Sequence, residues 1–167
     1  GLDGVVAKRR DATYLPGSRD AVVKVKEHRS ADCVVIGIRW KAGGRETIAT
    51  LLLGLYREDG GLDYVGSCAV GARLRAQVAE RVLPLLDEES DRRFSEPNRW
   101  GTGELEEAAV RPELVVEVRY DKVQGNRFRH GTKFVRWRED KAPADCTWRE
   151  LRPPRDPDAP GVEILLR

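Results

Sequence analysis

The strongest constraint on the fold of this 167-residue chain is the order of its strand-like segments. Residues 33–38 form a nearly continuous run of β-type apolar side chains, and residues 47–56 and 62–70 are two further segments of the same kind. Gly43-Gly44 and Asp59-Gly60-Gly61 separate them and have the composition of tight turns. The sequence therefore predicts three consecutive strands, the last two joined as a hairpin.

A helix is predicted after these strands. Leu74, Val78 and Val82 recur at spacings of four residues, which places them on one apolar helix face. Pro84 lacks the backbone N–H that a helix interior needs, so the helix is expected to kink or end near Leu83.

The second half of the chain is predicted to add two strands. Residues 87–113 are polar and contain several prolines and glycines, so they are expected to form an irregular surface excursion. Residues 114–120 and 131–137 have strand patterns, with a turn at Gly125-Asn126 between them. Three strands, one helix and two strands predict a mainly β domain over residues 30–167, a five-stranded OB-fold barrel with one helix. Other small barrels have the same number of strands.

The first 29 residues are predicted to be a separate piece. Residues 4–8 and 21–26 are strand-like and are joined by a turn-rich stretch around Pro16-Gly17. Two strands cannot bury a core alone, so this piece must dock on a missing part or on the domain formed by residues 30–167. At the other end, residues 152–160 are expected to form a loop and residues 162–166 a last short strand.

Composition excludes some classes of protein and leaves others open. The formal net charge is +2, from 30 basic and 28 acidic residues, so bulk charge does not indicate a nucleic-acid-binding protein. Basic residues nevertheless cluster at 8–10 and 122–141, and a local basic face is compatible with this balance. No apolar stretch approaches the roughly 18 residues of a membrane span. The chain contains no methionine, from which we expect truncation or processing upstream.

The cysteines do not indicate a metal site or a disulfide framework. Cys33, Cys68 and Cys146 are odd in number and have no paired spacing, and the chain has only two histidines. Cys33 and Cys68 lie in apolar strand-like runs, so buried, inert thiols are expected, which fits a reducing cytoplasm.

Two lysines provide a possible phosphate site. Lys24 and Lys26 alternate on a predicted strand, so both side chains point to the same face and present two ammonium groups there. A Lys-x-Lys sequence alone is equally typical of an exposed edge strand, and its context decides between these interpretations.

Three segments, in order, resemble the later nucleotidyltransferase motifs of ATP-dependent DNA ligases. They are Asp3-Gly4-Val5-Val6-Ala7-Lys8, Val23-Lys24-Val25-Lys26 and Arg138-Glu139-Asp140-Lys141, which are similar to the fourth, fifth and sixth motifs. The likeness covers essentially the whole chain and is nearest to bacterial ligase C and to the ligase module of ligase D. One departure is Val22, where many family members have tryptophan.

The resemblance assigns roles to the first two motifs. It implies that residues 1–29 are the final strands of an adenylation domain, whose earlier part is missing from this chain. It implies that Asp3 helps to hold Mg²⁺ and that Lys8, Lys24 and Lys26 contact the nucleotide, with ATP as the cofactor.

The resemblance also assigns roles to the last motif. Arg138 and Lys141 would bind phosphates, and Asp140 would orient them. In the family this motif orients the pyrophosphate leaving group during self-adenylation and then rotates away so that DNA can be engaged.

Arginine and lysine side chains that neutralise phosphates supply most of the affinity for DNA. The candidates in this sequence are Arg9, Arg10, Arg39, Lys41, Arg45, Arg73, Arg127, Arg129 and Lys133. Trp40 and Trp137 are candidates for stacking on bases, although large aromatic side chains in a small β domain more often fill its core.

The predicted function is therefore that of a DNA ligase fragment. The intact enzyme would transfer AMP from a lysine to the 5′-phosphate of a nicked duplex and then seal the nick. The fragment is expected to be monomeric and cytoplasmic, with no membrane association. The alternatives are a stand-alone OB module that binds single strands, a fragment of an RNA ligase or capping guanylyltransferase, and a barrel that binds proteins. No Lys-x-Asp-Gly nucleophile motif is present in the sequence, so this chain alone is expected not to adenylate itself.

Overall fold

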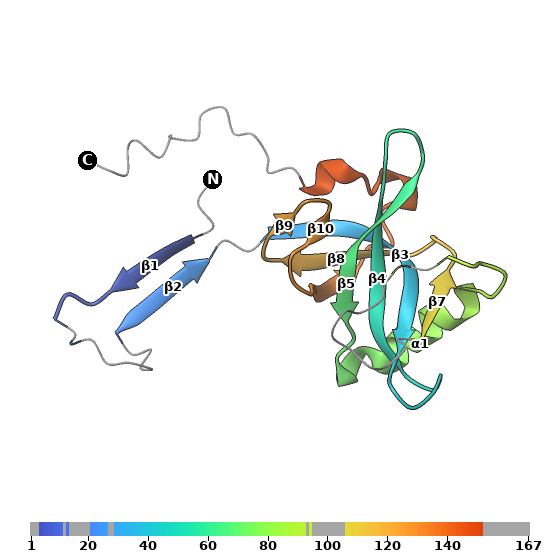
Figure 1. The fold of residues 1–167 in the computed structure, drawn as a ribbon, viewed down its shortest axis with the longest axis horizontal. Coiled ribbons are helices and arrows are strands. Elements are labelled where there is room, and N and C mark those ends of the chain that lie inside the picture. Colours follow the sequence, from blue (N-terminus) through green and yellow to red (C-terminus); the bar gives the residue numbers. More distant parts are fainter. Residues whose placement is uncertain are drawn as a thin grey trace. The chain divides into compact units, whose positions relative to one another are not determined.

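A computed structural model describes residues 4–11, 13, 21–26, 29–92, 94 and 106–151 (Figure 1). The chain divides into two compact units between His28 and Arg29. Asp3, the loop predicted at 152–160 and the strand predicted at 162–166 lie outside the described residues.

The first unit contains the two strands that the sequence predicts. β1 (Gly4–Lys8) and β2 (Val22–Lys26) are antiparallel, with Gly4 opposite Lys26 and Lys8 opposite Val22. Val5 and Val25 lie opposite each other and are 61% and 60% exposed. A two-stranded ribbon with exposed valines has no core of its own, as the sequence indicates.

The second unit is built on five main strands. β3 (Arg29–Trp40), β4 (Ile48–Tyr56) and β5 (Leu62–Ala69) are followed by β8 (Val115–Tyr120) and β11 (Lys133–Trp137). Their order in the sheet is β11-β8-β3-β4-β5, and all neighbours are antiparallel. Each of the five overlaps a predicted segment, but β3 extends beyond the predicted 33–38 at both ends.

The long strand β3 needs partners along its whole length, and this need explains a strand that the sequence does not predict. Its first half pairs with β8, and residues 37–39 pair with β7 (Glu107–Val110). β7 in turn pairs with the two-residue strand β6 (Leu86–Asp87). The prediction that residues 87–113 are irregular throughout is therefore wrong. Glu-Ala-Ala-Val has little strand character, but the buried backbone groups of β3 must be hydrogen-bonded.

The mainly β class with one α-helix is confirmed. An isolated parallel bridge joins Cys68 of β5 to Thr132, the residue before β11, where the two ends of the strand order come together. There the Thr132 N–H donates to the Ser67 carbonyl over 2.9 Å. Since no continuous ladder joins β5 to β11 in the described residues, the closed five-stranded barrel stays a prediction.

The predicted turn at Gly125 lies in a small hairpin. β9 (Val123–Gln124) and β10 (Arg127–Phe128) are antiparallel, and Gly125 has a φ of 58°, which glycine adopts without strain. This hairpin lies between β8 and β11 along the chain.

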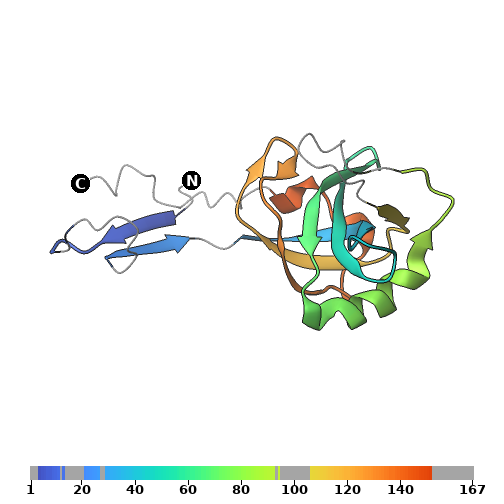
Figure 2. The same cartoon turned by 60° about the horizontal axis from the view of Figure 1, so that its bottom comes forward.

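The helix ends where Pro84 predicts, next to Leu83. A 3-10 turn, η1 (Ala72–Leu74), leads into α1 (Arg75–Val82), and a second turn, η2 (Leu83–Leu85), contains Pro84. Val78 and Val82 are fully buried, and α1 lies across one end of the sheet (Figure 2). Within the described part of the chain, no helix combines the length and the hydropathy that a membrane crossing needs.

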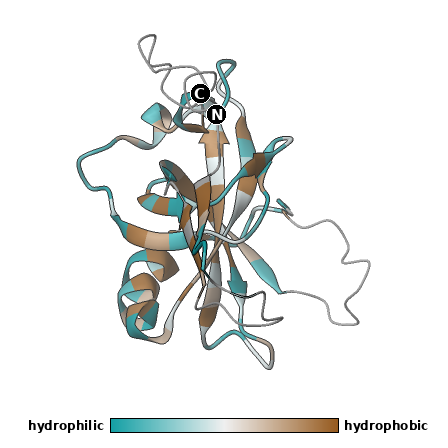
Figure 3. Cartoon of the chain, turned by 90° about the vertical axis from the view of Figure 1, so that its left-hand side faces the viewer, coloured by the Kyte–Doolittle hydropathy of each residue, from teal (hydrophilic) through white to brown (hydrophobic). Residues whose placement is uncertain are grey.

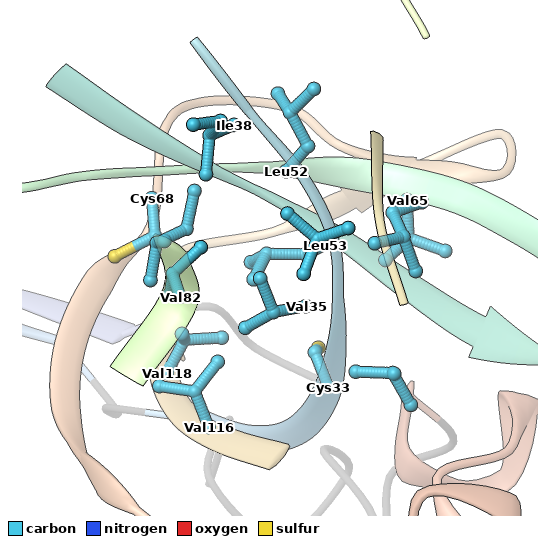
Figure 4. Close-up of a cluster of buried hydrophobic side chains, with 14 of the residues drawn as sticks. Cys33, Val35, Ile38, Leu52, Leu53, Val65, Cys68, Val82, Val116 and Val118 are labelled. Atoms are coloured by element: carbon cyan, nitrogen blue, oxygen red, sulfur yellow. The ribbon is translucent and has the colours of Figure 1, made fainter. Parts of the chain in front are cut away.

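Side chains from β3, β4, β5, β8 and α1 meet in one core. Figure 4 shows them converging, and the hydrophobic colouring of Figure 3 follows the central strands while the loops are largely hydrophilic. All three cysteines are free and buried, and burial raises the pKa of the Cys146 thiol to about 12. The burial predicted for Cys33 and Cys68 is therefore confirmed.

The last described residues lie beside the β4–β5 hairpin. Two 3-10 turns, η3 (Pro143–Asp145) and η4 (Trp148–Leu151), contact it (Figure 1). The Tyr56 N–H donates to the Cys146 carbonyl over 2.8 Å, and the Trp148 indole N–H donates to Asp63 over 3.1 Å. These bonds fix η4, which carries Glu150.

The pairing of β7 with β3 can be tested at Gly37. A Cβ atom there would come within 2.7 Å of the Phe94 ring and 2.9 Å of the Ala108 carbonyl oxygen in β7. We expect Gly37→Ala to lower the free energy of unfolding in urea by about 1–3 kcal/mol. Gly71→Ala is the control, because a Cβ there meets nothing within 4 Å. Equal stabilities of the two variants would contradict the close approach of β7.

Candidate functional site: an ion cluster and a basic hairpin

Five charged side chains converge where β11 ends, and we call them the ion cluster: Asp32, Arg138, Asp140, Lys141 and Glu150. Its centre is the buried carboxylate of Asp32. Oδ2 of Asp32 accepts hydrogen bonds from Arg138 Nη1 over 2.7 Å and from Lys141 Nζ over 3.0 Å. The two cations of the predicted sixth motif thus share one acceptor atom.

Two further acids complete the ion cluster. Arg138 donates from Nε and Nη2 to the two oxygens of Asp140, each over 2.9 Å. Lys141 also donates to Glu150 Oε1 over 2.5 Å, and the other oxygen of Glu150 accepts from the Asp32 backbone N–H. Such charge-assisted and bidentate bonds are stronger than neutral ones.

Strand register explains why these side chains meet. Asp32 lies in β3 directly opposite Glu117 of β8, and Glu117 lies opposite Arg136 of β11. The register of β11 shifts between Phe134 and Arg136. This bulge keeps Arg136 on the outer face with Glu117, while Trp137 stays opposite the buried Val116.

The two cations and the central acid of the ion cluster are largely closed to solvent, whereas the Asp140 side chain is 62% exposed, and the cluster carries an excess of negative charge. The side chains of Arg138 and Lys141 are 19% and 18% exposed, and that of Asp32 is 10% exposed. Two cations face three carboxylates, so the cluster has a formal charge of −1. The second oxygen of Asp32, Oδ1, is buried and accepts no hydrogen bond from the described residues.

A contact with α1 holds the other side of the motif. Arg81 Nη1 lies 2.7 Å from the Glu139 carboxylate, and its guanidinium lies over the Trp137 ring at 5.5 Å from the centroid. Trp137 also packs edge-on against Phe134, and Trp40 is buried in the core. Both tryptophans therefore pack within the domain.

The ion cluster shifts the pKa values of Arg138, Asp140 and Lys141 in the directions that favour their charged forms. Hydrogen bonds from Arg138 lower the pKa of Asp140 to about 2, and the same pair raises the pKa of the Arg138 guanidinium. Burial lowers the pKa of Lys141, but its bonds to Glu150 and Asp32 outweigh burial and raise it. All of these charges persist at neutral pH.

The residues of the earlier motifs lie in or beside the first unit. Lys8 is exposed at the end of β1, and Lys24 and Lys26 lie in β2 opposite Val6 and Gly4. Asp3 lies outside the described residues. Among the residues that are described, no group of His, Cys, Asp or Glu side chains is arranged to hold a metal ion. The nucleotide and metal roles of these four residues stay predictions.

The predicted DNA-binding residues fall into two groups. Members of the first group either form ion pairs with acids of the chain or lie apart from one another. Arg39 is mostly buried and forms an ion pair with Glu107 at 2.7 Å. Arg9 pairs with Asp11 at 2.8 Å, and Arg45 lies 3.6 Å from Glu106. Arg10, Lys41 and Arg73 are exposed on separate segments.

The second group forms a basic surface around the β9–β10 hairpin. We call residues 119–133 the basic hairpin; it contains five Arg or Lys residues and one acid, Asp121. Arg129 and Lys133 are exposed, and the guanidinium of Arg127 lies 5.2 Å from the centroid of the Tyr64 ring. Lys133 lies opposite Arg119, an exposed residue of β8 that the sequence candidates omit. Like charges directly opposite each other repel and destabilise the strand pair. An anion bound between Arg119 and Lys133 would relieve this repulsion, so the pair favours anion binding.

Three residues of the site were missed, although the sequence contains signals for two. Arg119 alternates with the buried Val118 and Tyr120, which marks it as outward-facing. Asp32 is an acid inside an apolar strand run, and such an acid needs a cationic partner. Glu150 gives no comparable signal, because its position depends on η4.

Comparison with known proteins places the chain in a family. The profile described as the ATP-dependent DNA ligase C-terminal region matches residues 44–141, more than half of the chain. The chain therefore belongs to the family of ATP-dependent DNA ligase C-terminal regions, as its three motifs predict.

Individual relatives agree with this assignment. The chain is 46% identical over 165 residues to DNA ligase C1 of Mycolicibacterium smegmatis, covering 95% of this chain and 47% of that protein. It is 41% identical over 172 residues to DNA ligase C of Mycobacterium tuberculosis, covering 92% of this chain and 47% of that protein. It thus spans about half the length of the curated relatives it matches.

A solved structure supports the fold. The ligase domain of LigD from M. tuberculosis matches with a TM-score of 0.60 and 33% identity, over 87% of this chain and 47% of that one. A second match is a mycobacterial DNA ligase D complexed with ATP and MES, with a TM-score of 0.55 and 34% identity, over 85% of this chain and 45% of that one.

The Arg138–Asp140 pair can be tested by titration. We expect the Asp140 carboxyl to titrate near pH 2 in an NMR experiment, and near its ordinary 3.8 in Arg138→Ala. Because the folded pKa is the lower one, the pair's contribution to stability is present above pH 3.8 and is lost as the pH falls through 2. Lys141→Ala, which removes no bond to Asp140, is the control. A wild-type midpoint at the ordinary value would contradict the bidentate pair.

Proposed function

We propose that this chain is the carboxyl-terminal part of an ATP-dependent DNA ligase and supplies contacts to nucleotide phosphate and to DNA. The observation that carries the proposal is the convergence of Arg138 and Lys141 on Asp32 at the end of β11. Family membership supports it, since the matched region ends at Lys141. The intact enzyme would form an enzyme–AMP and a DNA–adenylate intermediate before the 3′-hydroxyl seals the nick.

The nucleotide contacts follow from charge and geometry. Nucleotidyl transfer depends mainly on positioning and on neutralising phosphate charge. Arg138 presents a planar fork that suits phosphate oxygens, and Lys141 presents a point charge beside it. Lys8, Lys24 and Lys26 would add contacts to the nucleotide of ATP. Asp3 would be the carboxylate for Mg²⁺, and the motif resemblance alone supports that assignment.

The basic hairpin is the proposed DNA surface. Exposed cations at Arg119, Arg129 and Lys133 lie on or beside one small hairpin, where phosphate contacts position a duplex without reading its sequence. The exposed large hydrophobic residues of the described chain include no aromatic side chain, which argues against a module that stacks single strands. Nicked duplex DNA is therefore the proposed partner, and a monomeric, cytoplasmic protein is proposed with it.

DNA binding by the basic hairpin can be measured by fluorescence anisotropy over a salt series, with nicked duplex, intact duplex and single strand as ligands. We expect Arg129→Ala/Lys133→Ala to weaken duplex binding and to reduce the salt slope by roughly two, about one per lost cation. The control Arg111→Ala/Arg149→Ala removes two exposed arginines that already pair with acids. Tighter binding to the single strand, or equal losses in both variants, would contradict the proposal.

Labelled ATP can test whether self-adenylation requires the part of the ligase that this chain lacks. We expect no covalent AMP on this chain alone, because it lacks the Lys-x-Asp-Gly motif. Joined to the part of DNA ligase C1 that it does not match, the chain should support sealing of a 5′-phosphorylated nick in DNA. AMP bound covalently to the isolated chain would contradict the assignment, and sealing of nicked RNA in preference to DNA would point to an RNA ligase.

A further inference from the structure

Most of the N–H donors that suit a phosphate are already bonded to acids in this fold: three of the five on Arg138 and two of the three on Lys141. Nε and Nη2 of Arg138 are bonded to Asp140, and its Nη1 is bonded to Asp32. Lys141 uses two of its three N–H groups on Asp32 and Glu150. Both side chains are less than one-fifth exposed, so a phosphate that binds through these donors competes with the acids for them.

Stability alone is a weak reason for this arrangement. Isolating charges from water is costly, and well-packed apolar residues often replace buried ion clusters without loss of stability. Asp32 is 7% exposed in a strand whose neighbours are buried, and one of its oxygens accepts no bond from the described residues. A buried, incompletely hydrogen-bonded acid is therefore better explained by its effect on the positions of Arg138 and Lys141 than by a gain in stability.

We propose that Asp32 and Glu150 are positioning residues for the nucleotide step, which hold Arg138 and Lys141 together by occupying the same donors that a polyphosphate would take. The two carboxylates and the phosphate then compete for one pair of cations. This inference rests on the phosphate role of Arg138 and Lys141 proposed above and adds the groups that regulate it.

Asp140 can stay bound to Arg138 while a phosphate replaces Asp32 and Glu150. Its bidentate bond uses Nε and Nη2 of Arg138, so release of Asp32 frees Nη1 without freeing the guanidinium. Release of Asp32 and Glu150 frees Lys141 Nζ. The pair can therefore turn toward a phosphate as a unit, with Asp140 still attached to Arg138.

Charge determines how strongly the acids compete. The formal charge of the ion cluster is −1 with all three acids present; it becomes 0 in Asp32→Asn and +1 in Asp32→Asn/Glu150→Gln. A unit charge about 4 Å away contributes about 1 kcal/mol even in bulk water, and that is roughly a fivefold change in affinity. Each substitution should therefore strengthen phosphate binding by roughly fivefold or more.

Titration calorimetry of this chain with sodium tripolyphosphate tests the inference. The variants are Asp32→Asn and Asp32→Asn/Glu150→Gln, each with and without Arg138→Ala/Lys141→Ala. Glu117→Gln is the matched control, since it removes one carboxylate from the strand position opposite Asp32, and Glu117 pairs with Arg136 instead. The control reports how much of any gain comes from net charge alone.

We expect tighter binding in Asp32→Asn than in Glu117→Gln, a further gain in the double variant, and loss of both gains when Arg138 and Lys141 are removed. Thermal unfolding recorded in parallel should show a lower melting temperature for Asp32→Asn. A purely structural role of Asp32 predicts lower stability with equal or weaker binding, so opposite changes in stability and affinity distinguish the two roles.

Failure of this inference can be told apart from failure of the proposed function. Unchanged or weaker binding in both acid variants overturns the competition, and the phosphate role stands if Arg138→Ala/Lys141→Ala still reduces wild-type binding. If removing the two cations changes tripolyphosphate binding in no background, both the competition and the phosphate role of this motif are overturned.

Discussion

The hydrogen bonding of β3 along both edges is the constraint on which the second unit depends. This strand pairs with β4 on one side, and with β8 and then β7 on the other. Eight consecutive residues from Ala31 to Ile38 are buried, so each of their backbone groups needs a partner. Two short strands and a chain reversal are recruited to complete the edge that β8 does not reach. The core, the sheet order and the place of α1 are consequences of that requirement.

The same strand, β3, also determines where the ion cluster forms. Asp32 is the only acid between Arg29 and Trp40, and strand alternation turns its side chain away from the core that Ala31 and Cys33 face. The carboxyl end of β11 and the turn η4 then bring cations and a second acid over it. The proposed phosphate contact is in this way coupled to sheet register: any change that moved β11 along β8 would separate Arg138 from its acceptor.

Patterns that depend on local spacing were predictable from the sequence, and patterns that depend on distant partners were not. Alternation and glycine turns predicted the five main strands, and Pro84 predicted the end of α1, because these signals act over a few residues. β7 was not predictable because its sequence is weak and β3, about 70 residues earlier, dictates its conformation. The motif order identified Arg138, Asp140 and Lys141, but Glu150 reaches Lys141 only through the packing of η4 on the β4–β5 hairpin.

The bulge in β11 has a consequence for how sequences of this kind can change in length. Val135 is the extra residue, and it lets Lys133 and Arg136 share the outer face while Phe134 and Trp137 share the inner one. If Val135 instead lay opposite Glu117 in a regular ladder, the two faces would be exchanged beyond it, turning tryptophan outward and arginine into the core. Loss of Val135 itself would remove the bulge and leave both faces as they are. A gap of one residue is harmless in the exposed turn at 41–46, whereas in β11 it preserves the two faces only at Val135, so comparisons among relatives should place a one-residue gap in this strand there.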